Sequence, residues 1–218
     1  MKRQIPLVNA EIYHIFSRSI AEYKIFNSQH DYSRMLQMLQ YYQMDPDSSF
    51  SYFITLDSVS KNGFKIYLDE VTQDKEKLVQ IIAFCLMPTH LHLVLKQLQD
   101  DGISKYFGNI LNSYTRYFNS RHKRKGPLWE AKFKNILVSQ NEQLLHLTRY
   151  IHLNPVTAHF VNKPEDWEYS SYREYIGEGG ACDYSDILDI TPQTYKKFVN
   201  DRISYQRELA KIKAIILD

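Results

Sequence analysis

The sequence predicts an α+β fold whose elements follow in the order β-α-β-β-α-β, as in a ferredoxin-like antiparallel sheet with helices on one face. Apolar runs typical of strands are interspersed with longer runs that have helical spacing. Only Pro88 and Thr89 separate the strand-like runs 78–87 and 90–97, so these two are expected to form an antiparallel hairpin. A length of 218 residues, 44% hydrophobic and 24% charged, suits one globular domain.

The expected elements are, in chain order, a strand at 11–19, a helix at 28–43, strands at 78–87 and 90–97, a helix at 102–122, a strand at 132–139 and a helix at 141–154. The first strand alternates and places His14 on the same face as Ile12 and Phe16. This order predicts the antiparallel sheet, and it leaves the last helix available to reach a functional site.

Local signals set the ends of the helices and the limits of the domain. Ser28 or Asp31 is expected to cap the first helix, and Pro155 to end the last one. A single domain at 1–176 is expected to carry an insertion at about 44–77, followed by a helical extension at 177–218. Within the insertion, "FSYFITL" and "FKIYLDEV" are expected to pair as a small hairpin.

Several classes of protein are excluded by composition. No apolar run approaches the roughly 20 residues needed to span a bilayer. The first residues show no apolar segment followed by a small-residue cleavage site, so no signal peptide is expected. Cys85 and Cys182 stand far apart and outside any paired spacing, which supports neither a disulfide framework nor a zinc site. A reducing, cytoplasmic location is therefore expected.

Two histidines stand one residue apart in "HLHLVL". Alternation along a strand puts His90 and His92 on one face and the intervening leucines on the other. The leucine face should meet the helices, leaving the histidine face open, where two imidazoles can converge on one metal ion. The alternative is a pair of half-exposed histidines at the start of a strand, because so short a motif often occurs by chance.

The last helix offers a nucleophile and a third ligand. Tyr150 and Asn154 stand four residues apart and so share one helix face. The phenol can attack a phosphate, and the amide oxygen can bind a metal ion. The alternative is a packing aromatic and a helix C-cap. Three more tyrosines compete for the nucleophile's role but lack a ligand-type residue one turn later and are interpreted as structural; they are Tyr106, Tyr114 and Tyr117.

Basic residues concentrate in one stretch of a chain whose net charge is only +2. They are Arg116, Arg121, Lys123, Arg124, Lys125, Lys132 and Lys134, with Glu130 as the one acid among them. Such a stretch suits a polyanion, although charge runs are more often solvated loops. If that polyanion is a nucleic acid, the stretch is a candidate clamp for its backbone, with Trp129 or Phe133 able to stack an unpaired base. Trp167 and the serines of "YSSY" are candidates to extend this surface.

Taken together, "MPTHLHLVL", "YFNSRHKRKGPLWEAKFK", "LTRYIHLNPVTAHFV" and "WEYSSY" resemble the single-tyrosine transposases of the HUH endonuclease superfamily. More narrowly, they resemble the REP-associated tyrosine transposases, over about residues 11–176 and in the family's motif order. The resemblance implies the same β-α-β-β-α-β sheet. It matches His90 and His92 to the HUH pair, Tyr150 to the nucleophile and Asn154 to the polar residue one turn later. Thr89 departs from the family, which commonly has asparagine there.

The resemblance also implies an activity. Tyr150 would attack single-stranded, hairpin-containing DNA such as a REP-like element and form a 5′-phosphotyrosine link with a free 3′-OH. A divalent cation, Mg²⁺ or Mn²⁺, would bind His90, His92 and Asn154 and polarise the phosphate. Two rival hypotheses remain: a non-catalytic hairpin-DNA-binding protein derived from a transposase, and a metallohydrolase that activates water and needs no tyrosine.

Overall fold

The structure is a computed structural model that describes residues 6–208. Its strands are β1 (Ile12–Arg18), β2 (Val79–Met87), β3 (His90–Gln97) and β4 (Lys134–Val138). Its helices are α1 (Gln29–Tyr41), α2 (Phe50–Phe53), α3 (Asp57–Asn62), α4 (Phe64–Thr72), α5 (Gly102–Arg121), α6 (Asn141–Thr157), α7 (Tyr172–Tyr175) and α8 (Pro192–Asn200). Short 3₁₀ turns lie at Ile20–Glu22, Tyr42–Met44 and Pro164–Asp166. No helix among residues 6–208 is both long enough and apolar enough to cross a membrane.

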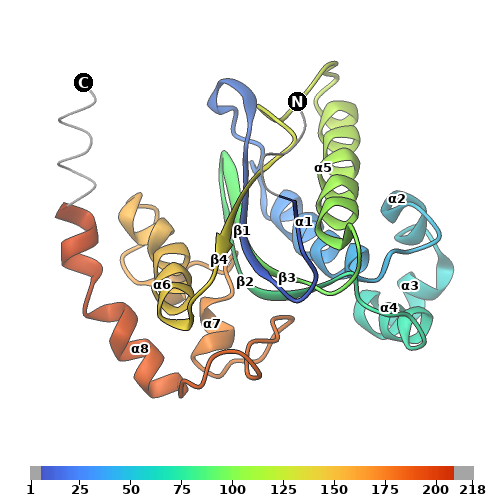
Figure 1. Cartoon of the computed structure of the whole chain (residues 1–218). Coiled ribbons are helices and arrows are strands. Elements are labelled where there is room, and N and C mark those ends of the chain that lie inside the picture. Colours follow the sequence, from blue (N-terminus) through green and yellow to red (C-terminus); the bar gives the residue numbers. More distant parts are fainter. Residues whose placement is uncertain (1–5, 209–218) are drawn as a thin grey trace.

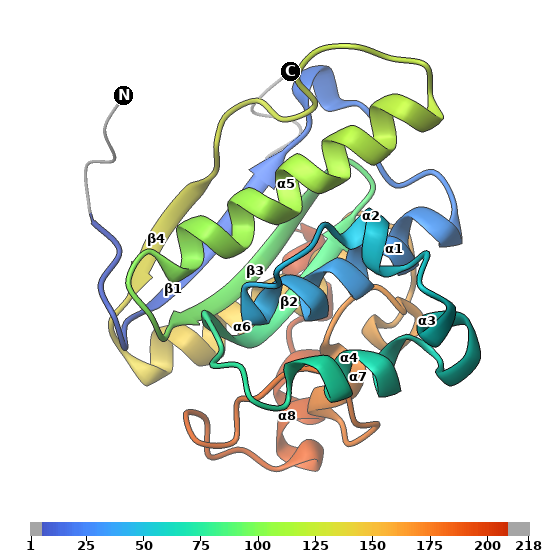
Figure 2. The same cartoon turned by 90° about the vertical axis from the view of Figure 1, so that its right-hand side faces the viewer.

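The strands form one antiparallel sheet in the order β2-β3-β1-β4. This is the strand order of the predicted β-α-β-β-α-β arrangement, so the fold prediction is confirmed. Helices α1 and α5 cover one face of the sheet, while α6, α7 and α8 lie on the other (Figure 1). The view turned by 90° shows α5 running along the sheet beside α1 (Figure 2). The sheet is therefore the middle of three layers.

The β2–β3 hairpin turns at Pro88 and Thr89, as the sequence predicts, because Met87 pairs directly with His90. Backbone groups of the segment after β1 hold its tip. The N–H of Ser19 donates to the carbonyl of Thr89 (2.9 Å), and the N–H of Ile25 donates to that of Pro88 (2.8 Å). These bonds fix the end of the sheet at which His90 stands.

Local chemistry explains where the two helices on the first face begin. Ser28 accepts a hydrogen bond from the backbone of Asp31, whose side chain bonds back to Ser28, so both predicted capping residues act in one capping box. Helix α5 begins at Gly102. A Cβ on this residue would clash with the backbone carbonyl of Leu78, so a glycine lets α5 start close to the sheet.

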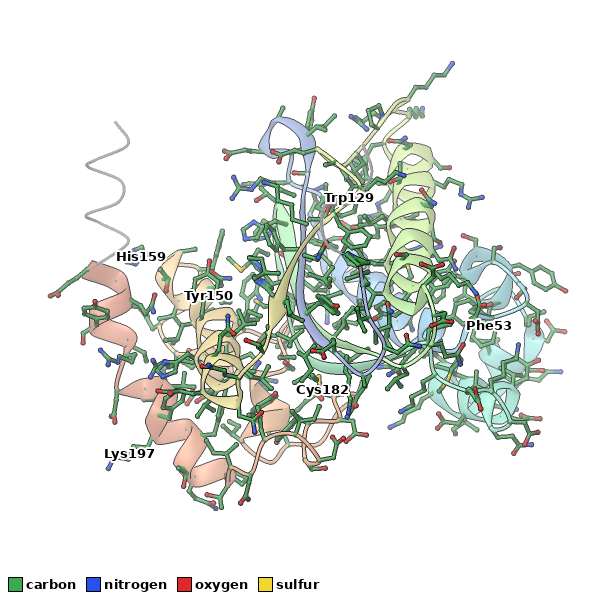
Figure 3. The ribbon with its side chains drawn as sticks, in the orientation of Figure 1. Phe53, Trp129, Tyr150, His159, Cys182 and Lys197 are labelled. Atoms are coloured by element: carbon green, nitrogen blue, oxygen red, sulfur yellow. The ribbon has the colours of Figure 1, made fainter. Side chains whose placement is uncertain are left out.

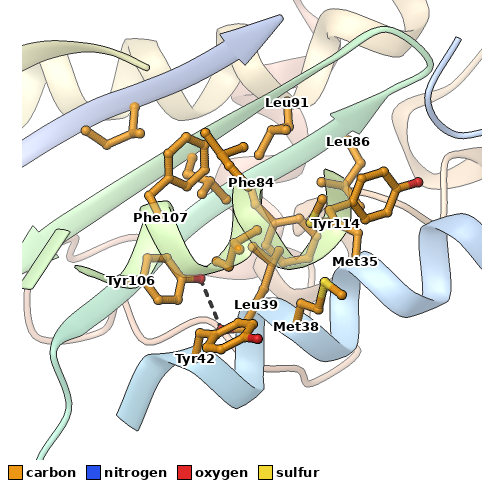
Figure 4. Close-up of a cluster of buried hydrophobic side chains, with 14 of the residues drawn as sticks. Met35, Met38, Leu39, Tyr42, Phe84, Leu86, Leu91, Tyr106, Phe107 and Tyr114 are labelled. Atoms are coloured by element: carbon orange, nitrogen blue, oxygen red, sulfur yellow. Dashed lines mark hydrogen bonds between the residues drawn. The ribbon is translucent and has the colours of Figure 1, made fainter. Parts of the chain in front are cut away.

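The larger core lies between the sheet and helices α1 and α5. It contains the three leucines of β3 that alternate with the histidines, all fully buried. Figure 4 shows part of it, where the hydroxyl of Tyr106 donates to the carbonyl of Leu39 (3.1 Å). Because the leucine face packs into this core, strand alternation fixes His90 and His92 on the opposite face.

The insertion contains helices α2, α3 and α4, so the predicted hairpin at 44–77 is wrong. Ser49 caps α2 by accepting a hydrogen bond from the N–H of Tyr52. The ring of Phe53 packs against Tyr41 of α1 (centroids 4.7 Å apart) and stacks on Tyr67 of α4 (5.5 Å). Phe50 and Phe53, two of the aromatic residues that suggested strands, are buried and pack on Tyr41 of α1 instead, which is tertiary packing overriding β-propensity.

Helix α6 passes through Pro155 and ends at Thr157, so the prediction that Pro155 stops the helix is also wrong. Proline removes one backbone donor, and Pro155 itself is buried. The helix closes one turn later, where the N–H of Ala158 donates to the carbonyl of Asn154 (2.9 Å). Asn154 is therefore inside the helix rather than at its cap.

A second core lies on the other face of the sheet, between the strands and α6, α7 and α8. It buries Val94 of β3, Ile151 of α6, and Tyr195 and Val199 of α8. The described part of the predicted 177–218 extension thus packs against α6. The part of the predicted helical extension beyond residue 208 lies outside the described residues.

Candidate active site

One cavity, of about 540 Å³, is lined by all four residues that the sequence analysis proposed as a nucleophile and metal ligands. His90 and His92 reach it from β3, and Tyr150 and Asn154 reach it from α6. The two elements are far apart in the sequence, and helix α6 brings them together by packing on the histidine face. The structure therefore places the four residues in one hollow, as the spacing within each motif suggested.

The histidine face is not left open, contrary to expectation. Helix α6 covers the far part of β3, so Val94 is fully buried and only 9% of His92 is exposed. His90, at the first position of the strand, is half-buried. The two rings stand edge to face with centroids 5.1 Å apart. Burial on this face thus increases along β3 from His90 to Val94.

Burial keeps both imidazoles neutral at physiological pH. It lowers the pKa of His90 to about 4, with a smaller contribution from the positive charge of Arg18. It lowers the pKa of His92 well below its ordinary value, and the neighbouring His14, His90 and Arg18 act in the same direction. A neutral imidazole is the form that binds a metal ion, so this environment favours binding of a cation over binding of a proton.

Tyr150 is accessible, with 43% of the side chain exposed. Its ring meets that of His92 edge to face, with centroids 6.0 Å apart. Trp129 and Tyr150 lie on opposite sides of the sheet (Figure 3). Tyr150 lines the cavity on the side of α6, away from the larger core. The phenol can therefore meet a substrate that enters the cavity.

The environment of Asn154 indicates whether the cavity suits a cation. Its amide nitrogen is buried and has no hydrogen-bond partner among the described residues. The two ends of an amide are nearly isosteric, and a half-turn places the oxygen there instead. Two neutral imidazoles and an amide oxygen suit Mn²⁺, and Mg²⁺ with water to complete its shell. No cluster of three or more His, Cys, Asp or Glu side chains that could hold a metal ion occurs within residues 6–208.

A buried hydrogen-bond network on the other side of α6 holds this helix in place. His152 is fully buried, with Nδ1 2.6 Å from the hydroxyl of Tyr195 on α8 and Nε2 2.8 Å from Oγ of Ser171. Ser171 Oγ in turn accepts from the N–H of Phe84 on β2 (2.9 Å). Burial lowers the pKa of His152 to about 3. The network ties α6 to both the sheet and α8, and so fixes the direction in which Tyr150 points.

The sequence analysis missed two residues that line the same cavity, His14 and Arg18 of β1. Nε2 of His14 lies 2.9 Å from Nδ1 of His92, and burial lowers the pKa of His14 to about 4. Arg18 pairs with His90 across the sheet and is exposed. The signal in the sequence was the alternation that puts His14 on one face of the first strand, but nothing there indicated which strand lies beside β3.

The structure brings only part of the basic stretch to the cavity. Lys134, at the start of β4, lines it, and Lys132 lines a neighbouring hollow of about 650 Å³ that shares Ala131 and Phe133 with it. The remaining basic residues lie on the last turns of α5 or in the loop that follows, which runs back beside the end of β1; they are Arg116, Arg121, Lys123, Arg124 and Lys125. Their role in binding DNA stays a prediction.

Within the loop, Arg124 has a structural role. It donates to Oδ1 of Asn119 (3.0 Å) and to the carbonyl of Pro127 (2.7 Å), which hold the turn together. Arg121 lies 3.9 Å from the buried carboxylate of Asp31. Lys123 and Lys125 are exposed. The loop therefore combines residues that shape it with lysines that face solvent.

Trp129 lies in the core, so the prediction that it can stack an unpaired base is wrong. Only 9% of its side chain is exposed, and its indole N–H donates to Leu111 O (3.2 Å) and Thr115 Oγ1 (3.0 Å). Since the side chain is buried and its N–H is already bonded inside the protein, Trp129 is a core residue. The serines of "YSSY" are likewise buried, so they do not extend a DNA-binding surface.

The competing tyrosines are structural, as predicted. Tyr106 and Tyr114 are fully buried and donate to the carbonyls of Leu39 and Ile25. Tyr117 donates to Oδ1 of Asp31 at 2.7 Å. Burial raises the pKa of all three phenols, which opposes formation of a phenolate.

Comparisons with known proteins show which families this chain is similar to. The family model described as "Transposase IS200 like" matches residues 54–154, a range that includes His90, His92, Tyr150 and Asn154. A Haemophilus influenzae (strain ATCC 51907 / DSM 11121 / KW20 / Rd) protein that carries the name of a REP-associated tyrosine transposase is 26% identical over 107 residues. That match spans 44% of this chain and 61%, less than two thirds, of the relative.

A solved structure of a REP-associated tyrosine transposase bound to a REP hairpin covers 87% of this chain and 98% of its own. It has a TM-score of 0.51 at 16% identity, which shows a shared fold. A crystal structure of a transposase from Deinococcus radiodurans R1 covers 69% of this chain and 95% of its own, with 16% identity and a TM-score of 0.36. The family model and the Haemophilus relative confirm the resemblance that the motifs indicated: this chain is similar to the IS200-like and REP-associated tyrosine transposases.

Proposed function

We propose that this protein is a metal-dependent single-stranded DNA endonuclease and strand transferase that acts on hairpin-containing DNA. The observation that carries the proposal is the single cavity that holds an exposed tyrosine, two neutral imidazoles and an amide whose nitrogen has no partner among the described residues. A binding module has no need of this combination. The relative solved with a REP hairpin supports a substrate of the same kind, a REP-like hairpin with an adjoining single strand.

In the proposed reaction, the phenolic oxygen of Tyr150 attacks a backbone phosphorus atom. The new bond joins this oxygen to phosphorus, while the bond from phosphorus to the 3′ oxygen breaks. Tyr150 gives up its proton, and the leaving 3′ oxygen takes one up. The products are a 5′-phosphotyrosine link and a free 3′-OH, and attack by a 3′-OH in the reverse direction rejoins the strands without ATP.

His90, His92 and Asn154 would hold a divalent cation, Mn²⁺ or Mg²⁺, in this cavity. When bound, the cation would neutralise charge on the phosphate and polarise it towards attack. Arg18 and Lys134 add positive charge at the same cavity and would hold the phosphate in position.

The proposal is tested by incubating the protein with Mn²⁺ or Mg²⁺ and hairpin oligonucleotides labelled at the 5′ or the 3′ end. Denaturing gels report a covalent adduct, and peptide mass mapping locates it. The expected result is an adduct on Tyr150 that needs metal, His90 and His92. It is absent in Tyr150→Phe, which still binds the hairpin, and present in the control Tyr52→Phe, which alters an exposed tyrosine on α2.

Other outcomes separate the rival functions. Complexes on native gels without any adduct across a broad panel of hairpins would favour the non-catalytic DNA-binding protein. Metal-dependent cleavage that survives in Tyr150→Phe would favour a hydrolase that uses water. An adduct that still forms in Tyr150→Phe would remove Tyr150 from the role of nucleophile.

A further inference from the structure

Each imidazole of the proposed cation site has a hydrogen-bond partner at its Nδ1 atom. Nδ1 of His92 lies 2.9 Å from Nε2 of His14, and the two rings stack with centroids 5.1 Å apart. Nδ1 of His90 lies 3.0 Å from the hydroxyl of Thr89. In both rings the remaining nitrogen is Nε2, so the same atom is left for a ligand in each case.

The antiparallel register brings His14 to this position. Phe16 of β1 pairs directly with His92 of β3, and His14 stands two residues before Phe16 on the same face. His14 is thus the diagonal neighbour of His92, within reach of a long side chain. Only 8% of His14 and 9% of His92 are exposed, so water competes little for the bond between them.

The position of the proton shared by His14 and His92 decides whether Nε2 of His92 can bind a cation. If His14 Nε2–H donates to His92 Nδ1, a neutral His92 carries its proton on Nε2, and that atom cannot bind a cation. If His92 Nδ1–H donates to His14 Nε2, the Nε2 atom of His92 keeps a free lone pair. The same alternative applies to His90, whose Nδ1–H can donate to the hydroxyl of Thr89.

We propose that His14, helped by Thr89 at the neighbouring ring, is a positioning residue that accepts the Nδ1–H of His92 and thereby presents the Nε2 lone pair to the cation. The inference rests on the proposed function, which assigns the cation to His90 and His92. Partners of this kind fix the tautomer and the ring orientation of a ligating histidine and raise its basicity.

His14 is better placed as such a partner than as a ligand. Its Nε2 atom faces the ring of His92 rather than open space in the cavity. In addition, His14, His90 and His92 do not form a metal-binding group of three, since the described residues contain none. Because Nε2 of His14 points at His92 and not at the cation site, His14 would affect the cation only through His92.

The first experiment measures the tautomers without any metal, by NMR of the full-length protein with ¹⁵N-labelled histidine. We expect the proton of neutral His92 on Nδ1 in the wild type, and a shift of its population towards Nε2 in His14→Phe. His14→Gln places an oxygen acceptor near the position of Nε2 and is expected to restore the wild-type tautomer. A His92 proton on Nε2 in the wild type would overturn the proposal.

The second experiment measures Mn²⁺ affinity without DNA, from the loss of the EPR signal of free Mn²⁺. His14→Phe is expected to weaken binding by about 10–100-fold, with His14→Gln close to the wild type. Thr89→Val should weaken binding in the same direction through His90. Thermal unfolding is followed for each variant, so that affinities are compared only between folded proteins.

Phe16→Leu is the matched control for packing, because the ring of Phe16 contacts those of His14 (4.9 Å) and His92 (5.9 Å) without a hydrogen bond. It should leave Mn²⁺ affinity nearly unchanged. An equal loss in Phe16→Leu and His14→Phe, or no loss in His14→Phe, would overturn the role of His14 alone. A wild-type protein that binds no Mn²⁺ would overturn the metal requirement of the proposed function, and the inference with it.

Discussion

The ring of Tyr150 on α6 stands edge-on to the ring of His92 on β3, with centroids 6.0 Å apart. Both residues line the same cavity, one from a helix and one from the sheet. Their distance depends on how α6 packs on the sheet, because no covalent or local constraint joins them. The side chains that hold α6 in place therefore matter as much for the site as those that line it.

Replacing Asn154 should change metal affinity more than stability. Asn154→Leu removes the amide oxygen and is expected to weaken Mn²⁺ binding by about tenfold or more, the equivalent of about 1.4 kcal/mol. Its thermal unfolding temperature should not fall, since the buried amide nitrogen has no partner to lose among the described residues. Asn154→Asp should bind Mn²⁺ more tightly. EPR titration and thermal unfolding test this, and an unchanged affinity in Asn154→Leu would remove Asn154 from the ligand set.

Breaking the network behind α6 should destabilise the protein. Tyr195→Phe removes the hydroxyl that lies 2.6 Å from Nδ1 of His152 and leaves a buried ring nitrogen without a partner. We expect a loss of about 1–3 kcal/mol in the free energy of unfolding, measured with urea. Tyr205→Phe, which alters a half-exposed tyrosine, is the control and should have no effect. Equal stability of Tyr195→Phe and the wild type would contradict the role of the network.

Stability should depend on pH through His152. The folded state holds the pKa of this residue near 3, against an ordinary value of about 6.5 in the unfolded chain. Between these values the unfolded state binds a proton that the folded state does not. Stability is therefore independent of this group above about pH 7 and falls with decreasing pH, by at most about 1.4 kcal/mol per unit.

The comparison of His152→Gln with the wild type isolates this effect, because His14 and His90 act in the same direction and stay in both proteins. The variant should have a lower free energy of unfolding than the wild type at pH 7, because it has lost part of the network. The gap between the two free energies should narrow as the pH falls to 5, because only the wild type loses stability through His152. Urea unfolding at several pH values measures it. A difference that stays constant with pH would show that His152 is not held neutral.

Binding of hairpin DNA should depend on two exposed lysines, one in the loop after α5 and one at the cavity. Lys125→Gln in the loop and Lys134→Gln at the cavity are each expected to weaken binding and to lower the salt dependence of the affinity by about 0.7–0.9 in log–log slope. Lys197→Gln, at the far side of the molecule on α8, is the control (Figure 3). Fluorescence anisotropy at several salt concentrations tests this, and equal slopes for all three variants would exclude a backbone clamp at these positions.

The spacing of residues within each strand and helix correctly predicted which side chains share a face. Strand alternation placed His90 and His92 on one face and the leucines in the core, and helical spacing placed Tyr150 with Asn154. The order of elements predicted the sheet, and the tight turn at Pro88 predicted the hairpin. These features follow from periodicities of two and 3.6 residues, which the chain carries regardless of its surroundings.

Other predictions failed where tertiary packing outweighed local preference. The aromatic runs of the insertion became helices because Phe53 buries its ring between Tyr41 and Tyr67. Trp129 looked available for stacking because it stands in a basic loop, yet the loop folds back and buries it against α5. Pro155 did not end α6, because the helix packs on the sheet beyond it and closes with a bond from Ala158.

The sequence by itself determined the fold class, the family resemblance, and the two pairs of residues that the proposed chemistry needs. Only the tertiary structure decided that both pairs share one cavity, that His14 contacts His92, and that His152 anchors α6 through Ser171 and Tyr195. The physical reason is that these contacts join residues on different elements. Their distances are set by strand register and by the packing of a helix on a sheet, and no short stretch of sequence encodes either one.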